Sequence, residues 1–361
     1  MNYLDFMGAV RHNAAMATTR ETQQRIQWYR TPVEKELLSN LTARSDLRGL
    51  LQTGAFLGLL LATGIAVCFA WGHRSMPLFI LLLLLHGTCY NFMLNGFHEL
   101  CHNTVFRTKL LNRFFVHIFS FLSIGNNLYL FTASHTQHHL YTLHPPRDLE
   151  VVLPVRYTLW SFVKSAIVNP LGLFYALRST ARLCLGRLDG EWEHRLFPES
   201  DVASRSRLFV WARITLAGHA VILAVSIASG LWLLPVLLTF APFYGGWLLF
   251  FCNNTQHVGL KDNVPDFRLC CRAFLVNPVI GFLYWHMNYH IEHHMYAAVP
   301  CYNLRRLHHA IRGDLPESPR GLFQTWRGII AILARQRKEP AYQYAAVLPR
   351  AAQTASGVEL T

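Results

Sequence analysis

Charged residues are scarce in this chain. Lys, Arg, Asp and Glu together make up 15% of its 361 residues, against about a quarter in a typical soluble protein. Hydrophobic residues supply 52%, aromatic residues 13%, and the mean hydropathy is +0.22. A chain of this length could form two soluble domains, but this composition indicates an integral membrane protein.

Acidic residues are rarer than basic ones. The chain has 20 Asp and Glu against 33 Lys and Arg, a formal net charge of +13. The basic residues flank apolar segments and form no stripe with interleaved aromatic side chains, which argues against a nucleic-acid partner. The charge favours anionic lipid headgroups or an acidic electron-carrier protein as partners.

Two signals of export are missing. The first twenty residues contain Asp5, Arg11 and Arg20 and no uninterrupted apolar run, so we expect no cleavable signal peptide. The eight cysteines include no C-x-x-C pair, and several lie within apolar segments. We interpret them as reduced, mostly structural thiols of a cytoplasm-facing protein.

Four apolar segments are each about as long as the ~20 residues that a helix needs to cross a bilayer. They are residues 50–71, 77–97, 208–229 and 231–251, and short turns join them into two hairpins. Residues 113–132 are less apolar and contain Gly125, which predicts a short re-entrant or interfacial segment. Residues 157–187 are basic and contain Trp160, which suits a helix lying among lipid headgroups.

The sequence therefore predicts an all-α, polytopic membrane protein with four transmembrane helices and a cytoplasmic helical cap. We expect an N-terminal segment over residues 1–49, a membrane domain over 50–310, and a basic helix followed by a disordered tail over 311–361. Four spans place both termini and the segment between the hairpins on one side. That side holds almost all Lys and Arg, so the positive-inside rule makes it the cytoplasm.

Histidines cluster where the apolar segments end. His98 and His102 stand four apart, on one face of a helix. The pattern H-x-x-H-H then occurs twice, and one more histidine follows the last apolar segment, four residues after Asn253. These further residues are His135, His138 and His139, then His257, then His290, His293 and His294.

Nine clustered histidines predict a metal site. Imidazole binds iron, zinc, copper and nickel well, and nine such ligands are too many for one tetrahedral zinc. They suit two metal ions with four or five nitrogen ligands each and positions left open for an oxidant or a substrate. The histidine count thus predicts a centre of two metal ions.

The order of these motifs resembles the membrane-bound fatty acid desaturase and hydroxylase family. The resemblance covers about residues 50–310 and is especially close in 288–304, N-Y-H-I-E-H-H-M-Y-A-A-V-P-C-Y-N-L. It implies that the nine histidines bind two Fe ions and that Asn253 lies just outside the ligands, where it supports them or reaches the centre through water. It also implies O2 as co-substrate and electrons from an external carrier of the ferredoxin, rubredoxin or cytochrome b5 type.

The activity implied is oxidation of an unactivated C–H bond in a lipid acyl chain from the bilayer, and we expect desaturation. Such chemistry needs an oxidant shielded from water beside a groove for an apolar chain. Hydroxylation of a lipid, an alkane or a carotenoid remains an alternative because both reactions begin with the same hydrogen abstraction. No H-P-G-G segment is present, and His290 stands where front-end desaturases have Gln, which argues against a fused front-end desaturase.

An alternative of another class is an intramembrane zinc metalloprotease. His98-Glu99-x-x-His102 matches the H-E-x-x-H motif, in which a glutamate activates water beside a zinc ion. This hypothesis leaves both H-x-x-H-H motifs unexplained. A haem-binding bundle would need histidines deep inside the spans, where only His86 and His219 stand, and we expect both to be hydrogen-bonded core residues.

Other polar residues near the motifs have two interpretations. Asp148, Glu150 and Glu292 are candidates to orient ligand imidazoles through their free N–H groups, or they are plain surface charges. We expect His144 in a loop and His308 and His309 on a solvated face; His286 could support the site or simply pack. Tyr284, Trp285 and Tyr289 are candidates to line a substrate groove.

Overall fold

The computed structural model describes residues 25–155 and 158–349, and this part of the chain is helical, with isolated bridges and no strand. The helices are α2 (Lys35–Thr42), α3 (Asp46–Gly72), α4 (Met76–Asn91), α5 (Met93–Cys101), α6 (Lys109–Leu122), α7 (Leu128–Tyr141), α8 (Leu159–Ala166), α9 (Pro170–Cys184), α10 (Gly190–Leu196), α11 (Val202–Ser229), α12 (Leu233–Leu238), η2 (Ala241–Phe243), α13 (Trp247–Asn253), α14 (Phe267–Cys270), α15 (Pro278–Leu283), α16 (His290–Met295), α17 (Cys301–Ile311), η3 (Arg312–Asp314) and α18 (Gly321–Lys338).

Three helical stretches of the described chain are long and apolar enough to cross a membrane. They are Asp46–Gly72, Met76–Cys101 and Val202–Ser229, and the second joins α4 to α5 across Phe92. α3 begins where the Ser45 hydroxyl accepts the backbone N–H of Arg48, an ordinary helix cap. α11 ends at Gly230, whose φ of 71° reverses the chain without a Cβ penalty.

Residues 231–251 do not form the fourth continuous helix that hydropathy predicted. They are divided among α12, η2 and α13. Pro242, four residues after the end of α12, lacks the N–H that would continue the helical hydrogen-bond ladder. Gly245 then takes a φ of 68° and packs so closely on α4 that a Cβ would lie 2.7 Å from the backbone nitrogen of Thr88. Local chain breakers therefore override the apolar composition.

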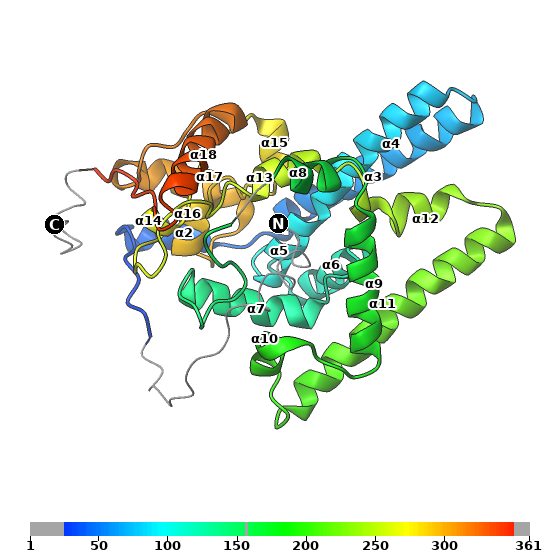
Figure 1. Ribbon diagram of the computed structural model, residues 1–361, viewed down its shortest axis with the longest axis horizontal. Coiled ribbons are helices and arrows are strands. Elements are labelled where there is room, and N and C mark those ends of the chain that lie inside the picture. The colour runs from blue at the N-terminus through cyan, green and yellow to red at the C-terminus, as the bar shows by residue number, and fades with distance from the viewer. Residues whose placement is uncertain (1–24, 156–157, 350–361) are drawn as a thin grey trace.

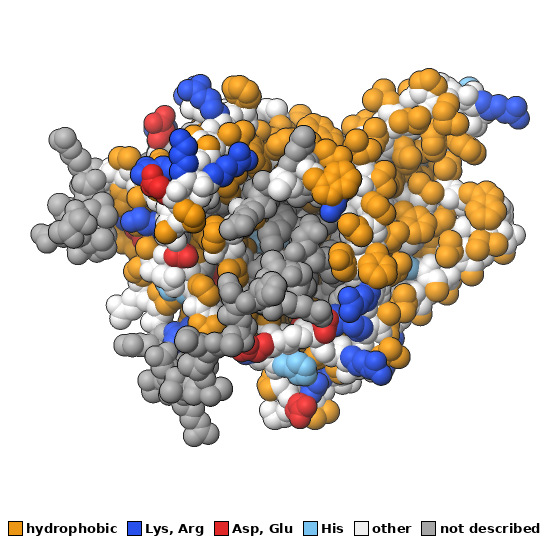
Figure 2. Space-filling model, in the orientation of Figure 1, with side chains coloured by type: hydrophobic (Ala, Val, Ile, Leu, Met, Phe, Trp, Pro, Cys, Tyr) orange, Lys and Arg blue, Asp and Glu red, His pale blue; other side chains and the backbone are white. Residues whose placement is uncertain are grey.

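The two hairpin turns lie at one end of the molecule, and the C-terminal helices lie at the other (Figure 1). Figure 2 shows apolar side chains over the hairpins and Lys, Arg, Asp and Glu mostly elsewhere on this face. Large apolar side chains of α3 and α11 are exposed, among them Leu61, Phe69, Ile214 and Val221. Such extended apolar surface suits contact with lipid.

The region between these ends holds the largest buried core, into which α5 packs closely. A Cβ at Gly96 would lie 2.6 Å from the indole ring of Trp285, so only glycine permits this approach. Trp285 and the neighbouring Tyr284 are fully buried. The close packing fixes α5 just before its first histidine.

The C-terminal region is more ordered than the sequence suggested. The basic helix expected within residues 311–361 does not continue directly from α17, because the chain is interrupted around Pro316 and Pro319 and resumes as α18. The tail after this helix was expected to be disordered, yet the N–H of Tyr344 donates to the carbonyl of Gly259 at 2.8 Å. The predicted tail beyond residue 349 and the predicted segment before residue 25 lie outside the described residues.

Candidate metal centre

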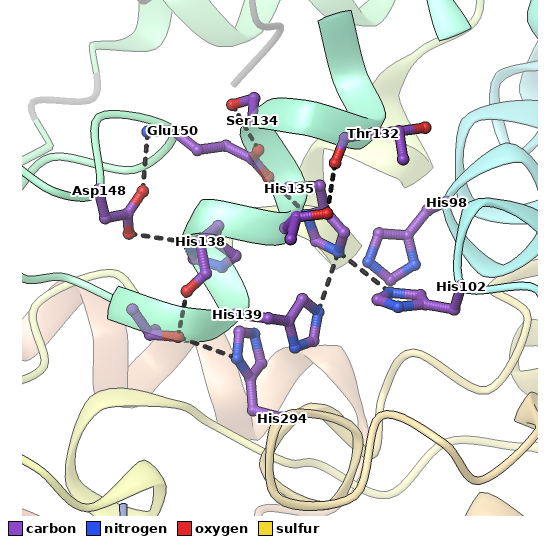
Figure 3. Close-up of polar contacts among 12 residues, drawn as sticks. His98, His102, Thr132, Ser134, His135, His138, His139, Asp148, Glu150 and His294 are labelled. Atoms are coloured by element: carbon purple, nitrogen blue, oxygen red, sulfur yellow. Dashed lines mark hydrogen bonds and ion pairs between the residues drawn. The ribbon is translucent and has the colours of Figure 1, made fainter. Parts of the chain in front are cut away.

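The structure brings all nine predicted histidines together at the meeting point of α5, α7, α16 and the residues after α13. Figure 3 labels His98, His102, His135, His138, His139 and His294. The nine histidines form two groups, in each of which the possible ligand nitrogens lie within 4.8 Å of one another. The five-histidine group consists of His98, His102, His135, His139 and His293, and the four-histidine group of His138, His257, His290 and His294.

The H-x-x-H-H spacing explains this division. Residues four apart on a helix share a face, whereas the residue between them points about 60–100° away. On α7, His135 and His139 therefore join the five-histidine group, and His138 joins the other. On α16 the assignment is reversed. His290 and His294 join the four-histidine group, and His293 joins the five-histidine group. Each motif thus contributes to both groups.

Neighbouring imidazoles approach one another through their Nε2 atoms. In the five-histidine group, His135 Nε2 lies 3.2 Å from His102 Nε2 and 3.0 Å from His139 Nε2. In the four-histidine group, His290 Nε2 lies 2.9 Å from His257 Nε2 and 3.1 Å from His294 Nε2. Two nitrogens bound at right angles to a metal at about 2.1 Å stand about 3.0 Å apart. Both groups therefore match the spacing of ligands around an ion.

Hydrogen bonds on the outer side fix the tautomers. His135 Nδ1 lies 2.7 Å from a Glu150 oxygen, His138 Nδ1 lies 2.8 Å from Asp148, and His257 Nδ1 lies 2.8 Å from the Cys270 carbonyl. Carbonyl and carboxylate oxygens only accept, so each Nδ1 carries a proton and donates it. Each Nε2 therefore turns a lone pair toward its group, as metal-binding histidines do.

Two further contacts complete this outer layer. The buried Glu99 carboxylate lies 3.1 Å from His98 Nδ1, which donates to it, and 3.5 Å from His293 Nδ1. One carboxylate therefore contacts two imidazoles of the five-histidine group. The Thr142 hydroxyl lies 3.1 Å from His294 Nδ1 and donates to the His138 carbonyl. Both contacts limit rotation of the rings.

Burial keeps most of these imidazoles neutral and able to bind a cation. Burial, reinforced by repulsion between neighbouring histidines, lowers the pKa of His102 and of His257 to about 3. The same causes hold the pKa well below its ordinary value in five others: His135, His139, His290, His293 and His294. His138 differs, because burial is outweighed by the Asp148 carboxylate and its pKa is raised.

The other candidate residues are placed less uniformly. Asp148 and Glu150 contact ligand-type imidazoles, but the buried Glu292 carboxylate contacts His308, which belongs to neither group. The Asn253 side-chain oxygen accepts from Asn95 at 3.1 Å and so links α13 to α5. The sequence had not suggested Thr142 or the Cys270 carbonyl. Thr142 stands seven residues after His135, on the same helix face, which is only a weak indication of its contact. A backbone carbonyl such as that of Cys270 leaves no mark in the sequence.

The other histidines singled out in the sequence lie away from the two groups. His86 bonds Thr63 and the Leu237 carbonyl, and His219 bonds Thr239 and the Phe121 carbonyl, which confirms both as hydrogen-bonded core residues. His308 was expected on a solvated face, but α17 turns it inward and it is buried. His144 and His286 are partly buried, and His309 is exposed.

A cavity of about 150 Å³ adjoins both groups. Its walls include His98 and His135 from the first group and His138, His257 and His290 from the second. The other lining residues are Glu150 and a set of apolar and amide side chains, among them Leu94, Phe131, Val151, Met287, Asn95 and Asn253. Tyr284, Trp285 and Tyr289 are absent from these walls and pack in the core instead. The space suits a short apolar segment lying against both groups.

Comparison with known proteins gives one positive result. The family model described as "Fatty acid desaturase" matches residues 74–326, about 70% of the chain, and this range contains all nine histidines. No curated protein matches the chain. The chain therefore belongs to the fatty acid desaturase family, which makes it an oxidoreductase that takes a lipid substrate and requires an electron donor.

Proposed function

We propose that this protein desaturates a lipid acyl chain with O2 at a centre of two iron ions. The observation that carries the proposal is that two histidine groups open on one cavity. The five-histidine group would hold one ion and the four-histidine group the other. Iron fits better than zinc because a set of nine imidazoles exceeds what tetrahedral zinc accepts.

Bound iron would supply the redox chemistry that activates O2 and breaks an unactivated C–H bond. The reaction consumes one O2, two electrons and two protons, removes two hydrogens from the chain and releases two waters. The protein holds the ligand imidazoles in place through Glu99, Asp148 and Glu150, whose carboxylates accept the Nδ1 protons. These carboxylates also offset positive charge in a buried region.

The cavity positions the substrate and excludes water. The apolar side chains among its walls favour the methylene groups of an acyl chain, and its small volume limits how many of them lie beside the histidines. Desaturation requires that a second hydrogen on the neighbouring carbon be within reach after the first is removed. Hydroxylation requires instead that oxygen rebind first, so sub-ångström placement of the chain separates the two outcomes.

We also propose that the chain crosses the membrane four times, with the histidines and both termini in the cytoplasm. The interrupted stretch from α12 to α13 would be the fourth crossing, and it ends just before His257. The α3–α4 turn carries one cation, Arg74, and the α11–α12 turn carries none, which supports an external position for both turns. Substrate would enter from the bilayer, and electrons would arrive from the cytosol.

The metalloprotease hypothesis has less support. In an H-E-x-x-H protease the glutamate must face a water molecule beside the metal. Glu99 instead contacts the outer nitrogens of His98 and His293. Its carboxylate is therefore engaged in orienting imidazoles.

Mass spectrometry of total lipids from cells with and without the gene tests the proposed activity. We expect species that have lost two hydrogens, and we expect them to vanish when His138 or His293 is replaced by Ala. Species with one added oxygen would identify a hydroxylase. An unchanged lipid profile together with peptide cleavage that disappears in Glu99→Gln would refute the proposal.

A further inference from the structure

A chain of ring contacts joins the protein surface to the four-histidine group. The indole of Trp28 stacks on Phe267 with ring centroids 4.1 Å apart and an angle of 10°. Phe267 is fully buried and lies 5.4 Å, centroid to centroid, from the imidazole of His294. Trp28 itself is partly exposed. Because electron tunnelling weakens steeply with distance, such a series of contacts offers a short route from the surface to the site.

The segment around Trp28 is held firmly against the body of the protein. The Trp28 indole N–H donates to the Leu140 carbonyl at 3.0 Å, and the Tyr29 N–H donates to the Pro265 carbonyl at 2.9 Å. The guanidinium of Arg268 lies 3.7 Å from the centre of the Tyr29 ring. Figure 1 shows this N-terminal segment passing beside α14, on which Phe267 lies. A surface tryptophan with these restraints keeps a fixed distance to the site.

Basic residues surround Trp28. Arg25 and Arg30 flank it along the chain and are exposed. The His144 ring contacts Trp28 at 5.3 Å, and the His144 carbonyl accepts the N–H of Arg147. Lys261 belongs to the adjoining loop, in which the N–H of Asn263 donates to the Leu143 carbonyl.

Negative charge near this surface is compensated in part. Asp266 and Asp314 both pair with the buried Arg268 guanidinium at 2.7 Å. Asp262, next to Lys261, is a further acidic residue of the loop. Among the described residues of this area positive charge therefore prevails, and it would attract a negatively charged partner over a distance.

We propose that this Trp28 surface docks an acidic one-electron carrier protein and that electrons pass through Trp28 and Phe267 to metal bound by the four-histidine group. The surface consists of Arg25, Trp28, Arg30, His144, Arg147 and Lys261. The proposal rests on the proposed function, since it assigns the entry point of the electrons which that function needs. In each step the carrier loses one electron and the bound metal gains it, so two docking events supply one turnover.

The experiment follows reduction of the metal centre of the iron-loaded full chain in lipid nanodiscs by rapid mixing and absorbance. The probes are three acidic carriers in reduced form, a [2Fe–2S] ferredoxin, a rubredoxin and a soluble cytochrome b5, with dithionite as a small reductant that needs no docking. The carrier used for the variants is the one that reduces the wild-type metal centre fastest. With it, we expect Trp28→Leu to slow reduction of the metal centre at least about tenfold. Trp28→Phe, which keeps a stacked ring, should retain most of the rate. Trp160→Leu is the matched control, because that indole is 64% exposed elsewhere.

Charge reversal tests docking separately. We expect Arg25→Glu combined with Lys261→Glu to raise the Kd of the carrier about tenfold or more at low salt and less at high salt. The control pair, Arg178→Glu with Arg187→Glu, reverses two exposed cations near α9 and should leave the Kd unchanged. Neither pair should alter reduction by dithionite.

Three results would overturn the proposal. Trp28→Leu could react with the carrier at the wild-type rate, the two charge-reversal pairs could behave alike, or no acidic carrier could reduce the wild type while dithionite does. Failure of the proposed function would be distinct, because the purified protein would then hold no reducible iron and dithionite too would give no signal.

Discussion

Replacing Glu150 by Gln should weaken one metal site and spare the other. One Glu150 oxygen lies 2.7 Å from His135 Nδ1, and the other accepts from the Ser134 hydroxyl at 2.8 Å. Gln keeps the size of the side chain but removes the charge that pairs with the outer N–H of His135. Loss of such a partner typically costs 10–100-fold in metal affinity, about 1.4–2.7 kcal/mol. The loss should fall on the five-histidine group.

Asp148→Asn is the complementary change. Asp148 accepts from His138 Nδ1 at 2.8 Å, and His138 belongs to the four-histidine group. A titration of the metal-free protein with ferrous iron against a chelator of known affinity, at pH 8, should resolve two sites. Burial raises the pKa of Glu150 to about 7, so its carboxylate is ionised at that pH. We expect each variant to weaken a different site.

Glu193→Gln serves as the control. Glu193 is a fully buried glutamate whose carboxylate accepts from the Asp189 backbone N–H and contacts neither histidine group. Its substitution should leave both metal affinities unchanged. The assignment of histidines to two groups would be refuted if Glu150→Gln and Asp148→Asn weakened the same site, or if all three variants behaved like the wild type.

Three further predictions concern activity, packing and pH. His138→Ala and His293→Ala should each abolish lipid oxidation while the protein still folds, as lipid mass spectrometry and size-exclusion chromatography would show; retained activity in either contradicts its role. Gly87→Ala should lower stability by about 1–3 kcal/mol, because its Cβ would lie 2.6 Å from the Tyr244 carbonyl oxygen. Gly58→Ala, with no neighbour within 4 Å, should be neutral or gain up to about 1 kcal/mol in the same thermal unfolding assay. Burial raises the pKa of Glu193 to about 7 from 4.5, so its folded form disfavours the charge and wild-type Tm should fall as pH rises from about 4.5 to 7. The Tm of Glu193→Gln should not show this fall. If its Tm followed the same pH profile as the wild type, the fall would not come from Glu193.

The local spacing of the histidines predicted much of the site. H-x-x-x-H and H-x-x-H-H specify faces of single helices, and such faces follow from helix geometry alone. Which group each face meets depends on how α5, α7 and α16 pack, so the opposite use of His138 and His293 needed the structure. Glu292 shows the same limit, because it follows His290 closely in sequence yet turns toward His308.

The long apolar helices were predicted in part. Uniform apolar composition identified α3, α4 with α5, and α11 correctly as helices long enough to span a bilayer. The same criterion treated residues 231–251 as a fourth helix, although Pro242 and Gly245 divide them. Hydropathy averages over a window and does not register single residues that remove an N–H or require a positive φ.

The most direct test of the two-metal account is the metal content of the purified full-length protein. Elemental analysis by mass spectrometry, with Mössbauer spectra of protein grown on ⁵⁷Fe, would count the ions and identify them. The account predicts two iron ions per chain, one for each histidine group. A single stoichiometric zinc with no iron would contradict it.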